Sequence, residues 1–467
     1  MSKHEISRRH FLGKASCAAI GSVTLFSGLF NLKASGLLAS NAHRMNFRPE
    51  NDYRALVCIL LAGGNDSFNM LVPSDNSSFN TYQETRSNMS LNQNDLLSLS
   101  AGSGSFGVHP SMPEVQQLFN QNKLAFLANV GTLVDPISDR AQFESGMGRL
   151  PLGLFSHADQ IMQWQTSVPN SRSANGWGGR LADLLMASNS SSDISMNISL
   201  AGNNMFQVGN QVVPYAITPF GQGSTGMLGY EEPGTLSQIR SAAVNNLLEQ
   251  QYQDIFKQTY ADVIRNGQES HELFSSAVAN IGLSTIFSPS YLSQSLSMVA
   301  RTIAARNALG MNRQTFFITL DGFDNHDELL NAHSALMTDL SKGLGEFDAA
   351  MEELGLSNDV TTFTISDFAR TLTSNGNGTD HGWGGNVIVT GGAVKGGKIY
   401  GQYPSLEVNQ NLDVGGGVLI PTMSTDEYFA ELALWLGVAK SDLPLVLPNL
   451  GNFYDLQNTD APIGFLL

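Results

Sequence analysis

Two continuous apolar runs, each ending abruptly in a polar turn, limit the folds that this chain can adopt. Residues 55–61 break at Ala62-Gly63-Gly64-Asn65-Asp66, and residues 315–320 break at the polar segment 321–326. An apolar run without alternation is typical of a strand buried on both faces of a sheet. A helical pattern follows the second run, with apolar residues at spacings of three and four: Leu336, Leu340, Leu344, Phe347, Met351 and Leu354. Strand followed by helix favours a parallel sheet covered on both faces.

The same alternation continues along the rest of the chain. We predict further strands at residues 124–130, 360–365 and 387–389, and helices at residues 112–120 and 425–438, with residues 236–310 mostly helical. Segments rich in Ser, Asn and Gly near 74–105, 186–204 and 220–226 indicate surface loops. The sequence therefore predicts an α/β fold, with a doubly wound, mostly parallel sheet flanked by helices.

The first 42 residues are typical of an export signal. Residues 7–12, Ser-Arg-Arg-His-Phe-Leu, form a twin-arginine signature, and an apolar stretch follows at about residues 18–30. This stretch is too short and too rich in Gly and Ser for a membrane span, and Ser40-Asn41-Ala42 offers small residues for cleavage. The alternative is a chance Arg-Arg pair beside a buried apolar helix. We predict that residues 1–42 are a twin-arginine signal peptide, that the translocon is the partner during export, and that residues 43–467 form one periplasmic or secreted domain.

Charge and cysteine content exclude several classes of function. The chain has 25 Lys and Arg against 41 Asp and Glu; residues 1–42 hold five of the basic residues and one acid, which leaves 20 against 40 and a net charge of −20. Such a surface repels nucleic acid and anionic membranes, and an anionic substrate needs a local cation. Only Cys58 remains after cleavage, so no internal disulfide can form. No second long apolar run is present, so we expect no stable membrane insertion of the mature form.

Carboxylates and imidazoles recur where the predicted strands end. Asp66, Asp324 with His326, and Asp367 each follow an apolar strand, and His381 lies in a Gly-rich loop at residues 376–385. Ligands of open parallel sheets bind beyond the carboxyl ends of the strands. Carboxylate and imidazole groups are what zinc and similar divalent ions take as ligands. These five residues are therefore our candidate metal ligands.

Simpler roles exist for each residue taken alone. An Asp after a strand is commonly a turn or cap residue, and Asp324-Asn325-His326 fits an Asx-turn at a helix start. His109 and His157 could bring further imidazoles to the site, although a buried structural histidine is the more common role for each.

Four segments closely resemble the hallmark segments of a known family. That family is large, twin-arginine-exported and catalogued mainly as a domain of unknown function, within the alkaline phosphatase and sulfatase clan. The resemblance covers nearly the whole mature chain, and Asp-His-Gly-Trp-Gly-Gly at residues 380–385 is its most specific part. The segments are residues 61–66, 321–326, 366–370 and 379–385.

The resemblance implies an alkaline phosphatase-like sheet and usually two divalent metals beyond its strand ends. Asp66 resembles the clan's first metal aspartate, and His381 resembles its last metal histidine. Asp324 and His326 resemble the Asp and His of one metal, although one residue separates them here where the clan usually has three. Asp367 resembles the Asp of an Asp-His pair, but Phe368 stands in place of the His.

The clan's nucleophile usually starts a helix after the first strand, which makes two serines candidates for a catalytic role. Ser67 directly follows Asp66, and Ser111 precedes the helix predicted at residues 112–120, where the alternative role is a helix N-cap. No sulfatase-like Cys-x-Pro-x-Arg motif is present in the sequence.

By this resemblance we expect an exported, metal-dependent hydrolase of phosphate or sulfate esters. Its cofactor would be one or two divalent ions, Zn or Ca, Mg or Mn, and its substrate a small-molecule or polysaccharide ester. The leading alternative is a non-catalytic, metal-stabilised binding or assembly protein that keeps this fold. Phe368 and the lack of an evident nucleophile favour the alternative.

Overall fold

The computed structural model describes residues 52–100 and 105–466, so the predicted signal peptide lies outside the described residues. The chain divides into two compact units. Residues Ser224–Ser276 belong to the smaller unit, and residues 52–223 and 277–466 form the larger one. Within the described parts of the chain, no helix has both the length and the apolar character needed to cross a membrane.

A nine-stranded sheet forms the centre of the larger unit. Its strands are ordered β13-β5-β12-β9-β1-β8-β6-β7, and β14 pairs with β5. Their bounds are Arg54–Ala62 (β1), Leu124–Gly131 (β5), Asn197–Ser199 (β6), Tyr215–Ala216 (β7), Arg313–Asp321 (β8), Val360–Ser366 (β9), Gly385–Thr390 (β12), Lys398–Tyr400 (β13) and Met423–Ser424 (β14). Every strand predicted from an apolar run is therefore present.

The register of the central strands places their carboxyl ends at one edge. Strand β1 runs parallel to β8 and β9, with Ala62 opposite Asp321 and Leu61 opposite Ser366. Strand β12 is antiparallel to both β5 and β9. The expectation of a mostly parallel sheet is confirmed, and the segments that follow β1, β8 and β9 all begin at the same edge.

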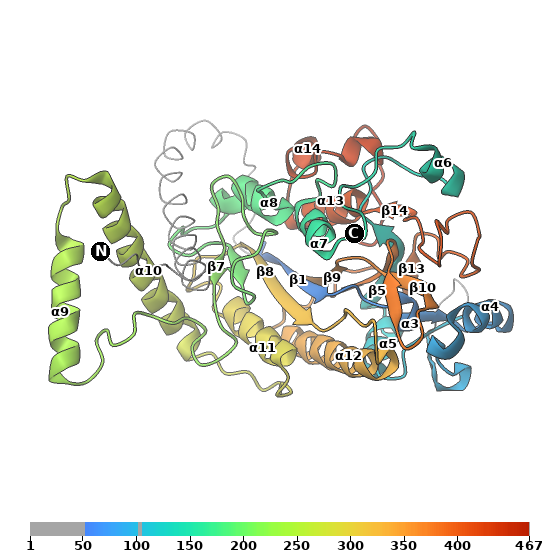
Figure 1. The fold of residues 1–467 in the computed structure, drawn as a ribbon. Helices are drawn as coiled ribbons and strands as arrows, with labels where there is room; N and C mark the ends of the chain where they lie inside the picture. The colour runs from blue at the N-terminus through green and yellow to red at the C-terminus, as the bar shows by residue number, and fades with distance from the viewer. Residues whose placement is uncertain (1–51, 101–104, 467) are drawn as a thin grey trace, which may run out of the picture. The chain divides into compact units, whose positions relative to one another are not determined.

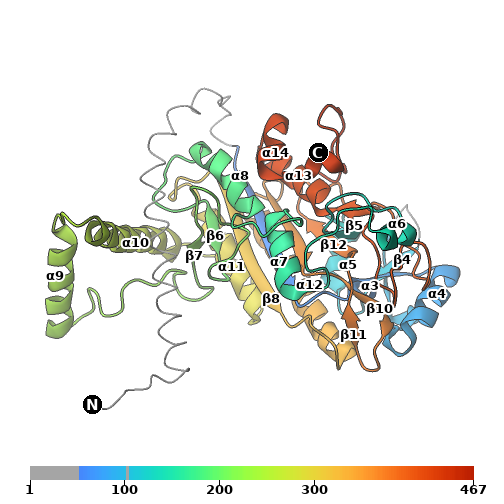
Figure 2. The same cartoon turned by 45° about the horizontal axis from the view of Figure 1, so that its top comes forward.

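Helices cover both faces of this sheet (Figures 1 and 2). One face carries α5, α11 and α12, and the other carries α7, α8, α13 and α14. Their bounds are Pro113–Asn120 (α5), His157–Thr166 (α7), Trp177–Leu185 (α8), Tyr291–Ala304 (α11), Leu329–Glu353 (α12), Thr425–Leu436 (α13) and Leu443–Val446 (α14). Because both faces are covered, the strands are buried along almost their whole length, which explains their unbroken apolar sequences.

The stretch expected to be mostly helical contains three helices. Two of them, α9 (Thr235–Glu249) and α10 (Ile255–Ala279), precede α11. The prediction for residues 236–310 is confirmed.

Two of the predicted surface loops contain regular structure instead. Residues 74–105 include α4 (Asn76–Arg86), whose N-cap Asp75 accepts a hydrogen bond from Ser78 N, and residues 186–204 include β6. Helix α4 buries only Phe79, Tyr82 and Arg86, so its apolar pattern is too sparse to stand out among the surrounding Ser and Asn residues. The loop prediction was wrong because capping and the contacts of three side chains outweigh this polar composition.

Two small sheets lie beside the carboxyl edge. Strands β10 (Arg370–Ser374) and β11 (Thr379–His381) form an antiparallel hairpin that pairs Arg370 with His381. Strands β2 (Leu71–Pro73), β3 (Leu97–Ser98) and β4 (Phe106–Val108) form the second sheet. The hairpin carries His381, one of the predicted metal ligands.

A buried carboxyl group in α13 should make stability depend on pH. Burial raises the pKa of Asp426 to about 8, against the opposing effects of Ser167 and Arg180. The folded-state pKa exceeds the unfolded value, so this group's stability contribution is complete below about pH 4 and is lost as pH rises to about 8. We expect Asp426→Asn to remove this part of the pH dependence, on the order of several kcal/mol. Urea unfolding of chelator-treated protein at pH 5 and 8.5 measures it, and identical pH slopes for both proteins would contradict it.

Candidate metal centre

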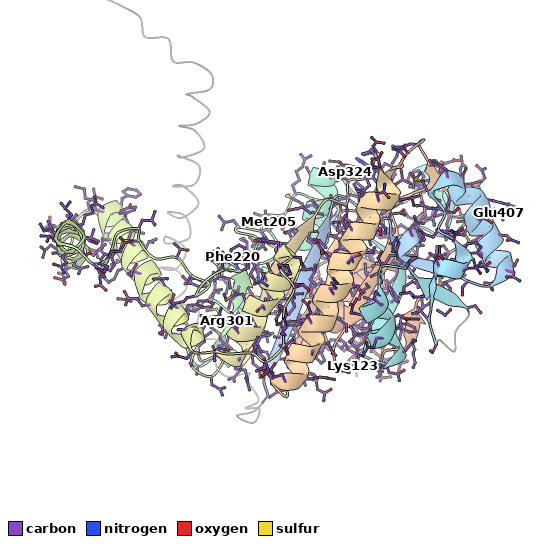
Figure 3. The ribbon with its side chains drawn as sticks, turned by 90° about the horizontal axis from the view of Figure 1, so that it is seen from below. Lys123, Met205, Phe220, Arg301, Asp324 and Glu407 are labelled. Carbon is purple, nitrogen blue, oxygen red and sulfur yellow. The ribbon has the colours of Figure 1, made fainter. Side chains whose placement is uncertain are left out.

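Three imidazoles and one carboxylate converge at the carboxyl edge of the sheet. Asp324 and His326 lie in the turn between β8 and α12, His381 ends β11, and His157 is the first residue of α7. Figure 3 shows Asp324 near the start of α12, with Lys123 near the other end of that helix. Three segments that are distant in sequence therefore meet at one point.

The facing atoms of these side chains are close together. The Nε2 atom of His381 lies 3.0 Å from Nε2 of His157 and 3.0 Å from Nε2 of His326. The Oδ1 atom of Asp324 lies 3.1 Å from Nε2 of His326, 3.5 Å from Nε2 of His157 and 3.7 Å from Nε2 of His381. Tetrahedral zinc with bonds of about 2.0–2.1 Å separates its ligand atoms by about 3.3 Å. The five separations are close to this value. The ligand atoms of His157, Asp324 and His381 also lie within 4.8 Å of one another, a mutually close set that does not include His326.

The far side of each imidazole ring is held by an acceptor. His157 Nδ1 lies 2.7 Å from Asp367 Oδ2, His381 Nδ1 lies 2.8 Å from the Phe155 carbonyl oxygen, and His326 Nδ1 lies 3.2 Å from Asp380 Oδ1. A carbonyl oxygen only accepts hydrogen bonds, so the Nδ1 atom of His381 is the donor to Phe155. When His157 and His326 donate from Nδ1 to their carboxylates in the same way, the three Nε2 atoms are free to bind a metal.

The His381 nitrogen thus faces the nitrogens of both other rings, and the Asp324 oxygen lies near all three nitrogens. The lone pairs of these nitrogen and oxygen atoms repel one another unless a positive charge lies between them. A single proton can bridge only one pair of these atoms. A divalent cation satisfies all of them, and acceptors behind ligating histidines are the usual support for such a site. The residues fit a metal ion.

Local backbone geometry explains why these segments approach so closely. Gly63 has φ +116°, and a Cβ there would collide with the backbone nitrogen of Asp324. Phe155 has the left-handed φ of 72°, and its carbonyl oxygen accepts from His381. The next residue, Ser156, is the N-cap of α7 and starts the helix at His157. A strained non-glycine backbone of this kind is common at functional sites.

The surrounding charges prepare these groups for metal binding near neutral pH. Burial acts to raise the pKa of Asp324, but the hydrogen bond from Arg370 and nearby positive charge lower it overall. Burial lowers the pKa of His381, against the effect of its bond to Phe155. An ionised carboxylate and a neutral imidazole are the forms that bind a metal.

Three of the five predicted ligands belong to this cluster: Asp324, His326 and His381. Asp367 lies behind His157, where its Oδ2 contacts the ring and its Oδ1 accepts from Gly63 N at 3.0 Å. Its carboxylate orients His157, and the structure does not aim it at the point where the other ligand atoms meet.

The structure does not bring Asp66 into the cluster. Its Oδ2 forms an ion pair with Arg86, and both side chains are fully buried. Arg86 also donates to the carbonyl oxygens of Thr371 and Leu372, at 3.0 and 3.3 Å. The charge of Asp66 is therefore neutralised by a guanidinium group.

Neither candidate nucleophile contacts the cluster. Ser67 begins the short helix α3 (Ser67–Met70), is buried, and accepts from Asn386 N at 2.9 Å. The Ser111 hydroxyl lies 2.8 Å from the Ser334 hydroxyl. No hydrogen bond links either side chain to Asp324 or to the three histidines in the described residues.

His157 joins the cluster although the sequence favoured a structural role for it. Its position depends on a loop and a helix start that no apolar run announces. The one local signal is Ser156, a typical N-cap residue, which predicts that His157 lies in the first turn of a helix.

Fold and site together define an α/β protein with a doubly wound sheet and a His and Asp cluster at its carboxyl edge. The chain belongs to the family described as "Protein of unknown function (DUF1501)", whose model matches residues 53–414. This membership confirms the resemblance seen in the four hallmark segments. No curated protein matches the chain.

Solved structures that resemble this chain include a sulfatase and a lipoteichoic acid synthase, by their descriptions. The PsFucS1 sulfatase from Pseudoalteromonas sp. is 11% identical with a TM-score of 0.34, over 91% of this chain and 72% of that chain. The lipoteichoic acid synthase LtaP from Listeria monocytogenes is 10% identical with a TM-score of 0.35, over 85% and 76% of the two chains. Likenesses this weak carry no argument about function, and the architecture rests on the strand order and register above.

Proposed function

We propose that His157, Asp324, His326 and His381 bind one divalent metal ion and that this centre hydrolyses phosphate or sulfate esters. The observation that carries the proposal is the convergence of three imidazole nitrogens and one carboxylate oxygen at a partly exposed edge. Imidazole-rich sets favour zinc over calcium or magnesium, which prefer oxygen ligands. Because Arg86 neutralises Asp66, we infer one ion rather than two.

The chain's own residues orient this centre. When bound, the ion supplies Lewis-acid chemistry, polarising an ester oxygen and activating the attacking group. Asp367 and the Phe155 carbonyl fix the rings of His157 and His381. Arg370 donates to Asp324 Oδ1 at 2.9 Å and to Gly63 O at 3.3 Å, so it positions the carboxylate ligand and is not a clamp for the ester anion.

A second function has a specific observation in its favour. Ser67 is buried and Ser111 bonds to Ser334, so neither candidate nucleophile is hydrogen-bonded to the cluster in the described part of the chain. A metal-stabilised binding or assembly protein needs no such nucleophile. This candidate predicts a bound metal and no turnover of any ester.

Metal analysis and an ester panel separate the two functions. We expect one equivalent of metal per chain and turnover of a phosphate monoester, a phosphate diester or an aryl sulfate in the presence of zinc or manganese. Chelation should abolish that turnover, and re-addition should restore it. If well-folded, metal-loaded protein turns over none of these esters, the hydrolase proposal is wrong and the binding or assembly function is favoured.

The proposed site of action is the periplasm or the outside of the cell, with a small-molecule or polysaccharide ester as substrate. The twin-arginine signature at residues 7–12 supports this location. Amino-terminal sequencing of the exported protein tests it, and a mature chain that still carries residues 1–42 would contradict cleavage after Ala42.

A further inference from the structure

We propose that His326 is an exchangeable ligand, which binds the metal in the resting protein and detaches when an oxyanion enters. The inference rests on the proposed metal centre and assigns different roles to its three histidines. It follows from differences in exposure, in anchoring and in the geometry of the ligand set.

The first difference is exposure. The His326 side chain is 43% exposed, against 32% for His157 and 27% for His381. His326 lies in the turn that connects β8 to α12, whereas the other two rings are attached to a helix start and a strand end. His326 is therefore the imidazole with most freedom to turn into solvent.

The second difference is the strength of the anchor behind each ring. Asp367, behind His157, is 1% exposed and is itself held by Gly63 N. The anchor of His381 is a backbone carbonyl. Asp380, behind His326, is 62% exposed, and its contact of 3.2 Å is the longest of the three.

The Asp380 anchor is also shared. Its Oδ1 accepts from Asn375 Nδ2 at 3.1 Å, and Asn375 Nδ2 lies 3.2 Å from the His326 carbonyl oxygen. If the His326 ring turns away, Asp380 keeps a partner and remains solvated. Detachment of His326 therefore leaves no buried group unpaired. The same movement at His157 would leave the buried Asp367 carboxylate without that partner, which is costly.

The third difference is that the ligand set is complete without His326. The ligand atoms of His157, Asp324 and His381 all lie within 4.8 Å of one another, and His326 is not part of this mutually close set. His326 Nε2 lies 3.0 Å from His381 Nε2 and 3.1 Å from Asp324 Oδ1. Four protein ligands are typical of closed, structural zinc sites, and three protein ligands with one open position are typical of catalytic sites. Movement of His326 converts the first arrangement into the second.

Full mature protein loaded with Co²⁺ provides the test, because its visible spectrum reports the coordination. We expect His326→Ala to retain one equivalent of metal, with affinity lowered about 10- to 100-fold, a loss similar to that from removing a supporting residue behind a ligand. The matched variant His157→Ala should lose the metal. Inorganic phosphate, the probe, should bind several-fold more tightly to His326→Ala than to the wild type, because it no longer competes with the imidazole.

The spectra give the decisive comparison. With saturating phosphate, the wild-type spectrum should converge on that of His326→Ala with phosphate. Loss of metal from His326→Ala to the same extent as from His157→Ala would overturn the proposal, as would weaker phosphate binding. A wild-type protein that binds neither Co²⁺ nor Zn²⁺ would instead refute the metal centre itself.

Two anchor variants keep the test independent of the alanine variants' folding. Asp380→Asn weakens the His326 anchor, leaves the anchors of His157 and His381 in place, and should tighten phosphate binding with little change in metal affinity. Asp367→Asn weakens the His157 anchor and should lower metal affinity about 10- to 100-fold. Equal effects of the two variants would show that the histidines are equivalent, against the proposal.

Discussion

His381→Ala is expected to release the metal ion while leaving the sheet folded. Its Nε2 is the atom that both other imidazoles approach, at 3.0 Å each, so its loss removes the centre of the ligand set. Removing a supporting contact alone costs about 10- to 100-fold in metal affinity, so removing this ligand should cost more than 100-fold. Ester turnover, where the wild type shows it, should fall with the metal content.

Metal content after dialysis against a weak chelator, together with circular dichroism, measures this effect. His271→Ala is the control, because His271 lies in the smaller unit and contacts Ser224 and Ser275. The thermal midpoint of His381→Ala should match that of chelator-treated wild type, since both lack the ion. A His381→Ala protein with one full equivalent of tightly bound metal would show that the ion is held elsewhere.

The sheet was predictable because each of its central strands is buried on both faces. Burial on both faces produces an unbroken apolar run, and the abrupt polar turn that follows marks the carboxyl end. This reasoning places Asp324 and His326 after β8 and Asp367 after β9, as the structure has them. The rule concerns position along a strand, so it does not say whether a side chain faces a common point or lies one layer behind it. Asp367 lies one layer behind that point, against the ring of His157.

His157 shows where that reasoning ends. His157 is the first residue of α7, a helix that covers one face of the sheet. Its position depends on the left-handed backbone of Phe155 and on the N-cap Ser156. These are tertiary features without an apolar signature. The small number of histidines in the sequence limits the candidate ligands, but it does not show which of them bind the metal.

The ion-pair partner of Asp66 lies on a helix that was predicted to be a loop. Residues 74–105 contain α4, and Arg86, at the end of this helix, supplies the partner of Asp66. A carboxylate after β1 with no visible counter-charge looks like a metal ligand. Once α4 is known, the same carboxylate has a buried cation of its own.

The buried ion pair leads to the second large expected effect, which is on stability. Arg86→Met should destabilise the protein by about 3–5 kcal/mol, because it leaves the Asp66 carboxylate buried without a partner. Asp66→Leu should be destabilising for the converse reason. The double variant Asp66→Leu/Arg86→Met should recover much of the loss, since an apolar pair of similar volume can replace a buried ion pair at little cost. Urea unfolding in the presence of chelator measures all three.

A surface pair provides the matched control for the arginine substitution. Arg140 and Glu144 form an exposed i,i+4 ion pair, so Arg140→Met should leave stability almost unchanged. The double variant at Asp66 and Arg86 should also keep one equivalent of metal, because the ligand atoms of His157, Asp324 and His381 are untouched. Stability recovered together with metal lost would mean that Asp66 contributes to the metal centre after all. If stability and metal are both retained, the role of Asp66 is structural: it pairs with Arg86. Arg86 in turn donates to the backbone of β10, and Arg370, the first residue of β10, positions Asp324.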